Sequence, residues 1–175
     1  MDTAIKEYID SLDVNSIPWD RMFTAYGTAE HYPAMLAVLN ETRDEEEWLR
    51  ALGRISDFEH QSTLFPPAPF ALVFLVRILR KLRRDGNADR LASKLTDQLL
   101  YYRDVCEAAE RMEHAEPLGH FSELLEDRYL LPVDWTDDDL MSVFEDPEAV
   151  PDDLFYSLYY YSKIVLSQVT EEGIF

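Results

Sequence analysis

The chain has 175 residues, of which 47% are hydrophobic and one, Cys106, is a cysteine, and its formal net charge at pH 7 is −19. This length supports one hydrophobic core and so a single domain over residues 1–175, while one cysteine excludes an internal disulfide and a cysteine-based zinc site. A surface this negative repels nucleic-acid phosphates and anionic lipids, so the sequence argues against both as partners and favours a basic protein.

Hydrophobic residues follow a helical spacing along most of the chain, and no segment alternates with a period of two for long enough to predict a sheet. The first half of the chain contains four segments of this kind. We expect helices near Ile5 to Leu12, over Ala29 to Leu39, over Trp48 to Phe58 after a capping box at Thr42, and over Pro67 to Arg84.

The second half of the chain begins with the longest expected helix, over Ala88 to Glu113. Three shorter helical segments follow: a weak one over Phe121 to Asp127, one capped by Thr136 that ends near Phe144, and one over Pro151 to Val169. The sequence therefore predicts an all-α protein of about seven or eight helices.

An internal repeat at an offset of 39 residues indicates how these helices are arranged. Tyr26 matches Phe65, Ala29 matches Ala68 and Leu52 matches Leu91, and the offset is close to the ~40–47 residues of HEAT-type helical pairs. We therefore favour antiparallel helical pairs stacked as a short α-solenoid over residues 19–115, with acidic, aromatic-rich C-terminal helices over 116–175, and disfavour a four-helix bundle.

Several motifs in the first half of the chain resemble those of bacterial HEAT-like repeat proteins. The motifs are Tyr26-Gly27-Thr28-Ala29, Tyr32-Pro33-Ala34-Met35-Leu36, Ala51-Leu52-Gly53-Arg54-Ile55 and His60-Gln61-Ser62-Thr63-Leu64-Phe65, within residues 19–85. In that family an alanine and a proline start one repeat helix, and a His-Gln-Gly-Thr-like corner leads into the next, so Ser62 stands where the family tends to have glycine. The resemblance implies a binding scaffold, and in some members an immunity protein that lies beside a secreted toxin.

Three histidines are the candidates for an enzymatic role. His60, beside Glu59, is compatible with a general base, but the neighbouring polar residues favour a hydrogen bond at an inter-helix turn. His114 and His120 do not have the i, i+4 spacing of the His-Glu-x-x-His zinc motif, and a proline and a glycine lie between them. With no phosphate-binding loop or nucleophile elbow, we predict no catalytic residue, cofactor or metal, and keep an enzyme as the third hypothesis.

Acidic residues are concentrated in the last third of the chain. Residues 116–175 contain 15 Asp or Glu residues, and their only Lys or Arg residues are Arg128 and Lys163. Favourable interactions at helix N-termini explain why some of these acids occur where they do, but they do not explain why basic residues are nearly absent. Because unbalanced self-repulsion costs stability, we expect this asymmetry to serve a function.

Aromatic residues share this acidic region. Tyr156 and Tyr160 lie at i, i+4 on a face away from the expected core stripe of the last helix, which leaves both core packing and exposure open. Exposed tyrosines among acids are typical of protein interfaces. The predicted partner-binding residues are Asp134, Trp135, Asp137, Asp138, Asp139, Glu145, Asp146, Asp152, Asp153, Tyr156 and Tyr160.

These observations favour a non-enzymatic, acidic inhibitor, an immunity protein that neutralises a basic toxin, with a nuclease as one candidate, by covering its active site. The alternative is a HEAT-like scaffold or adaptor that binds a peptide or protein on its concave face. The N-terminus shows no signal-peptide pattern, and the longest apolar stretch, Leu64 to Val76, is shorter than the ~18 residues of a membrane-spanning helix. We therefore expect a cytoplasmic protein without a membrane partner, and the sequence predicts no particular oligomeric state.

Overall fold

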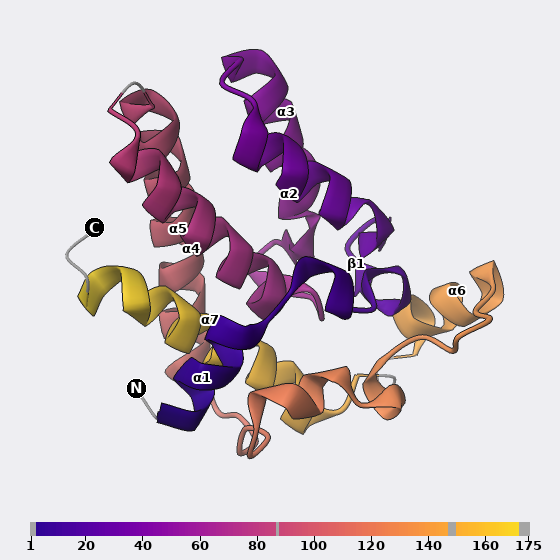
Figure 1. Ribbon diagram of the computed structural model, residues 1–175. Coiled ribbons are helices and arrows are strands. Elements are labelled where there is room, and N and C mark those ends of the chain that lie inside the picture. Colours follow the sequence, from indigo (N-terminus) through magenta and orange to yellow (C-terminus); the bar gives the residue numbers. More distant parts are fainter. Residues whose placement is uncertain (1–2, 87, 147–149, 172–175) are drawn as a thin grey trace.

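The computed structural model describes residues 3–86, 88–146 and 150–171 (Figure 1). Within these residues the fold is all-α, as the hydrophobic spacing predicts. The seven α-helices of the described chain are α1 (Thr3–Ser11), α2 (Tyr32–Glu41), α3 (Glu45–Ile55), α4 (Ala68–Arg84), α5 (Asp89–Glu110), α6 (Asp137–Glu145) and α7 (Asp152–Glu171).

Short 3₁₀ helices join several of these elements. They are η1 (Val14–Ser16), η2 (Trp19–Arg21), η3 (Ala29–His31), η4 (Ser56–Phe58), η5 (Phe121–Leu125) and η6 (Asp127–Tyr129). The expected α-helix over Phe121 to Asp127 was therefore wrong in type, since this stretch is η5 followed by η6. Likewise, the helix expected from Ala29 begins as η3, and α2 proper starts at Tyr32.

Two short β-hairpins, which the sequence pattern does not predict, precede α2 and α4. Strand β1 (Phe23–Thr24) pairs with β2 (Gly27–Thr28), and β3 (Glu59–His60) pairs with β4 (Thr63–Leu64), both antiparallel. At the turn of the second hairpin, Gln61 and Ser62 have φ angles of 52° and 66°. This left-handed region favours glycine. Ser62 therefore has a backbone conformation that glycine adopts more readily than serine.

The chain repeats one structural unit, a hairpin followed by two helices. The amide of Ala29 donates to the Met22 carbonyl at 2.9 Å, and 36 residues later the amide of Phe65 donates to the Phe58 carbonyl at 2.8 Å. The structural offset of the hairpins, and of the helices α2 and α4 that follow them, is thus 36 residues, not the 39 of the sequence matches. A shift of three residues leaves a helical side chain on the same face, which explains why apolar positions matched at the wrong offset.

Helix α4 lies at the centre of the packing. Helix α2 pairs with α3, α4 pairs with α5, α2 also contacts α4, and α7 packs against both α4 and α5. The unbroken apolar run from Ala68 to Val76 is buried because neighbours cover α4 on several sides. No helix in the described ranges combines the length and apolarity needed to cross a membrane.

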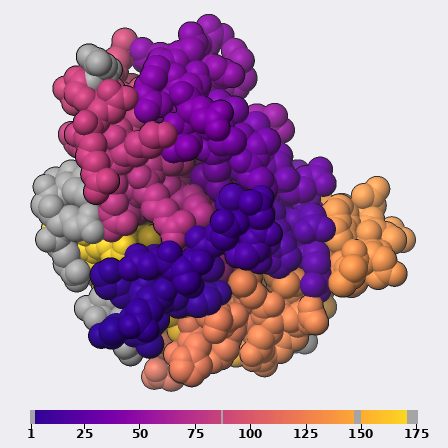
Figure 2. Space-filling view, in the orientation of Figure 1, coloured from indigo at the N-terminus to yellow at the C-terminus, as the bar shows by residue number. Residues whose placement is uncertain are grey.

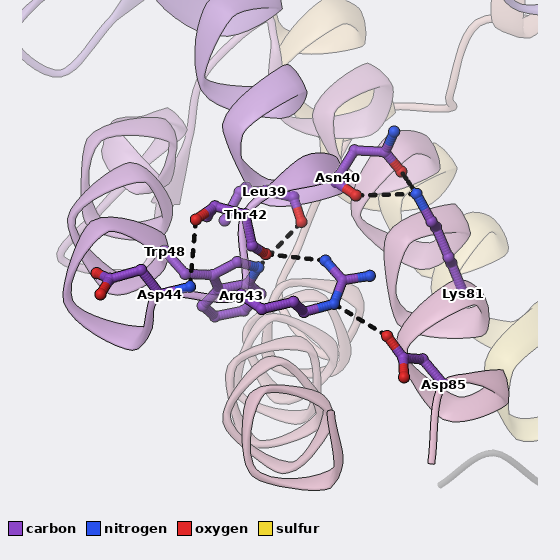
Figure 3. Close-up of polar contacts among 8 residues, drawn as sticks. All are labelled: Leu39, Asn40, Thr42, Arg43, Asp44, Trp48, Lys81 and Asp85. Carbon is purple, nitrogen blue, oxygen red and sulfur yellow. Dashed lines mark hydrogen bonds and ion pairs between the residues drawn. The ribbon is translucent and has the colours of Figure 1, made fainter. Parts of the chain in front are cut away.

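The basic residues of α4 hold the ends of two other helices. The Arg77 guanidinium donates to the carbonyls of Ile9 and Leu12 at the end of α1, each at 2.8 Å. The Lys81 ammonium donates to the Asn40 carbonyl at the end of α2, at 2.9 Å (Figure 3). Helix-terminal carbonyls lack intrahelical partners and carry partial negative charge, so they favour cations. These side chains therefore join helices to one another.

Trp48 anchors α3 to the end of α2. Its side chain is fully buried, and its indole N–H donates to the Leu39 carbonyl at 3.0 Å (Figure 3). The N-cap of α3 is Asp44, whose carboxylate accepts from the Glu47 amide at 2.9 Å, rather than the predicted Thr42. Thr42 does not cap α3 because it is the C-cap of α2, where its hydroxyl accepts from the Asp44 amide.

Candidate protein-binding surface

An acidic segment, Val133 to Asp146, projects from the body of the molecule (Figures 1 and 2). We call it the acidic arm. It consists of a turn at Val133 and Asp134, a short segment that ends at Thr136, and α6, which contains no buried residue. The arm carries seven of the eleven predicted binding residues: Asp134, Trp135, Asp137, Asp138, Asp139, Glu145 and Asp146. Sequence reasoning thus selected residues that the fold gathers on one projecting element.

The carboxylates of the arm have few internal partners. Asp134, Asp137 and Asp138 are exposed, and their carboxylates form no hydrogen bond or ion pair with another described residue. No lysine or arginine occurs from Tyr129 to Ser162 in the sequence. The charges of Asp134, Asp137 and Asp138 are therefore not paired within the described residues, and their field extends into the solvent.

A capping box holds the first turn of α6, as the sequence predicts for Thr136. The Thr136 hydroxyl accepts from the Asp139 amide at 3.4 Å, and the Asp139 carboxylate accepts from the Thr136 amide and hydroxyl, each at 2.8 Å. The hydrogen bonds from the backbone and side chain of Thr136 lower the pKa of Asp139. Asp139 thus stabilises the first turn of α6 and also adds negative charge to it.

We expect replacement of Thr136 by alanine to melt α6 while leaving the body folded. An N-cap contributes about 0.5–2 kcal/mol, and a helix of nine residues without buried side chains has little other stabilisation.

The stability of α6 should also depend on pH. Because the pKa of Asp139 is lowered in the folded state, the contribution of its carboxylate to the stability of α6 is present above the ordinary carboxyl pKa and is lost as the pH falls below about 4.

Amide exchange and chemical shifts of residues 137–145, recorded at neutral pH and at about pH 3, test this expectation. Ser142→Ala is the matched control, since the Ser142 hydroxyl donates to the Asp139 carbonyl and lies outside the cap. If α6 in the Thr136→Ala variant were protected as in the wild type, the capping box would not be what holds the arm.

The inner side of the arm is apolar. The ring of Phe144 packs edge-on against Phe23, with a centroid distance of 6.2 Å, although Phe144 stays 44% exposed. A cleft of about 470 Å³ separates the arm from the body and is also lined by Val143, Phe65 and Phe155. The arm therefore combines an apolar inner side with the exposed carboxylates of Asp134, Asp137 and Asp138.

The two predicted acids at the start of α7 differ in their surroundings. Asp152 is exposed and lines the cleft beside the arm. Asp153 is partly buried, and its carboxylate accepts from the Tyr129 hydroxyl at 3.2 Å and the Leu154 amide at 2.8 Å. Asp153 thus holds η6 against α7, and we remove it from the binding surface.

The two predicted tyrosines of α7 are less accessible than an interface anchor requires. Tyr156 is 7% exposed, and its ring stacks on the His114 imidazole with a centroid distance of 3.5 Å and an angle of 6°. Burial raises the pKa of Tyr156. Tyr160 is half-buried against Tyr156 and Tyr161. Of the two readings left open by the sequence, core packing is the correct one for Tyr156.

Phe155 is an exposed ring that sequence reasoning missed. It is 41% exposed and lies beside Asp152 at the edge of the cleft. The signal was available, because Phe155 falls outside the stripe of Leu154, Leu158 and Val165 that faces the core. An exposed aromatic ring next to the exposed carboxylate of Asp152 has the composition of an interface anchor.

His60 makes a hydrogen bond between the two hairpins. Its Nδ1 lies 2.9 Å from the Tyr26 hydroxyl, which links the two hairpins. The neighbouring Glu59 carboxylate accepts from the Ser62 amide at 2.7 Å and from the Tyr101 hydroxyl at 2.9 Å. The corner is hydrogen-bonded as the sequence indicated, but it is a β-hairpin and not a turn between helices.

Cys106, His114 and His120 are the other groups for which the sequence raises a reactive role. Burial raises the pKa of the Cys106 thiol to about 12, so it is protonated at neutral pH and is not a nucleophile. The His114 ring stacks on the ring of Tyr156. His120 precedes η5, and its side chain makes no capping hydrogen bond to that helix. No group of three His, Cys, Asp or Glu side chains in the described ranges is placed to hold a metal ion.

Comparisons with known proteins add no assignment: no protein family, curated protein or solved structure matches this chain.

Proposed function

We propose that this protein is a non-enzymatic inhibitor that binds a basic protein partner through its acidic arm. In this proposal it is a cytoplasmic immunity protein, and the partner is a toxin, with a nuclease as one candidate. One observation carries the proposal: six acids and no basic residue lie on a projecting element that contains no buried residue.

Inhibition would occur by occlusion. A nuclease site is built to receive phosphates, and the unpaired carboxylates of Asp137 and Asp138 can occupy the same basic groove. The exposed ring of Phe155 supplies apolar contact area beside them. Long-range attraction between the arm and a basic surface makes association fast and sensitive to salt.

The alternative is a HEAT-like scaffold or adaptor that binds a peptide or protein on the concave face of a short α-solenoid. The repeated unit of a hairpin and two helices favours it, because stacked helical pairs build extended binding surfaces. Such a face binds largely by shape and apolar contact. Salt dependence therefore separates the two functions.

The test is to mix the purified protein with the product of the adjacent gene and measure binding by calorimetry. We expect a complex whose Kd rises by at least about tenfold between low and high salt, together with loss of the partner's toxic activity. Absence of a complex at low salt would contradict the proposal. Binding that is insensitive to salt would support the scaffold instead.

A further inference from the structure

A groove of about 820 Å³ lies on the other side of Phe155 from the arm. The tip of the β3–β4 hairpin forms one wall, and the end of α5 with the segment that follows it forms the other. The first turns of α7, from Asp152 to Tyr159, form the floor. Asp152, Phe155 and Thr63 line both this groove and the cleft beside the arm, so the two are parts of one surface.

Hydrogen bonds to α7 hold the two walls in place. On the hairpin side, the Tyr159 hydroxyl donates to the Ser62 carbonyl at 3.0 Å and accepts from the Leu64 amide at 3.2 Å. On the opposite side, the Leu118 amide donates to the Ser157 hydroxyl at 2.8 Å, and the Tyr161 hydroxyl donates to the Leu118 carbonyl at 2.6 Å. The groove is therefore preformed, which lowers the entropic cost of filling it.

The groove combines an apolar interior with carboxylates at its edges. Met112, which is 71% exposed, and Phe155 contribute apolar surface, and the exposed imidazole of His114, which stacks on the buried ring of Tyr156, contributes aromatic surface. The carboxylates of Glu113 and Asp152 are exposed, and neither bonds to any other residue in the described part of the chain. The described lining includes no lysine or arginine.

This chemistry matches an arginine side chain. A guanidinium is planar, stacks on aromatic rings and donates two parallel hydrogen bonds to a carboxylate. Its three-carbon stem packs on apolar walls while the charged end reaches the rim. A lysine ammonium is more strongly hydrated and does not stack as a plane, so it fits this lining less well.

We propose that the groove binds an arginine side chain from an exposed segment of the basic partner. This inference rests on the proposed function, since it names the group by which the attracted partner is then held. The arm supplies long-range attraction, and the groove supplies a short-range contact that depends on residue type. Phe155 lies between the arm and the groove and contacts the partner there.

The test uses two blocked tripeptides, acetyl-Gly-Arg-Gly-amide and acetyl-Gly-Lys-Gly-amide, titrated into the full-length protein at low salt. Methyl signals of Met112, Ala108 and Ala109 report on the groove in NMR spectra. We expect the arginine peptide to shift these signals with a Kd in the millimolar range, at least about threefold tighter than the lysine peptide. Equal affinity of the two peptides, or shifts confined to the arm, would overturn the inference.

The variant Glu113→Gln with Asp152→Asn removes both carboxylates without changing side-chain size, and should weaken the arginine peptide by about tenfold. Asp138→Asn on the arm is the matched control and should leave the peptide affinity unchanged. An unchanged affinity in the double variant would also overturn the inference. Peptide binding without a complex with the adjacent gene product would refute the proposed function alone, and a complex without peptide binding would refute the groove alone.

Discussion

Replacing Asp137 and Asp138 with lysine is expected to slow association with the basic partner by about 10- to 100-fold at low ionic strength. Both carboxylates are exposed at the start of α6 and have no ion pair with a described residue, so their charge acts on the partner and not on the fold. Stopped-flow measurements at several salt concentrations test this. The difference between variant and wild type should shrink as salt rises, because exposed charges are screened.

Two controls separate the position of the charge from its total and from helix stability. Glu30→Lys with Asp97→Lys changes the net charge by the same amount at exposed positions on other elements, η3 and α5, and should slow association far less. Asp137→Asn with Asp138→Asn removes charge without placing lysine at the N-terminus of a helix, where cations are unfavourable. Equal slowing by both lysine pairs would show that net charge, and not the arm, attracts the partner.

The helices could be predicted from local patterns, because the residues that start, end and line a helix lie within a few positions of one another. The prolines before α4 and its basic last turn mark its ends, and Thr136 caps α6 as expected. The hairpins were missed because their two-residue strands are too short to show alternation. Their stability also depends on distant partners, such as the Tyr159 hydroxyl, which bonds the amide of Leu64 from 95 residues away.

The same limit explains which of the proposed binding residues are exposed in the structure and which are not. The acidic arm was visible because missing lysines and arginines are a property of the sequence itself. Tyr156 was misjudged because the ring that covers it, His114, lies 42 positions earlier in the chain. Asp153 was misjudged because its partner, Tyr129, belongs to another element. Composition thus predicts where charge gathers, whereas tertiary contacts decide which side chains are free to bind.

The largest stability effect is expected from Trp48→Ala. Removing a fully buried indole leaves a cavity between α2 and α3 and lowers the free energy of unfolding by about 3–5 kcal/mol. For a chain of this size the melting temperature should fall by roughly 6 °C or more. Urea unfolding followed by circular dichroism measures the change directly.

Two further variants divide this effect into its parts. Trp48→Phe keeps an aromatic ring in the site but leaves the Leu39 carbonyl without its indole donor, and should cost about 1–3 kcal/mol. Leu49→Ala, one residue later and 37% exposed, removes an apolar side chain from the partly solvated side of α3 and should cost less than about 1 kcal/mol. If Trp48→Ala cost no more than Leu49→Ala, Trp48 would not anchor α3 against α2, and the first repeat of the fold would be held by other contacts.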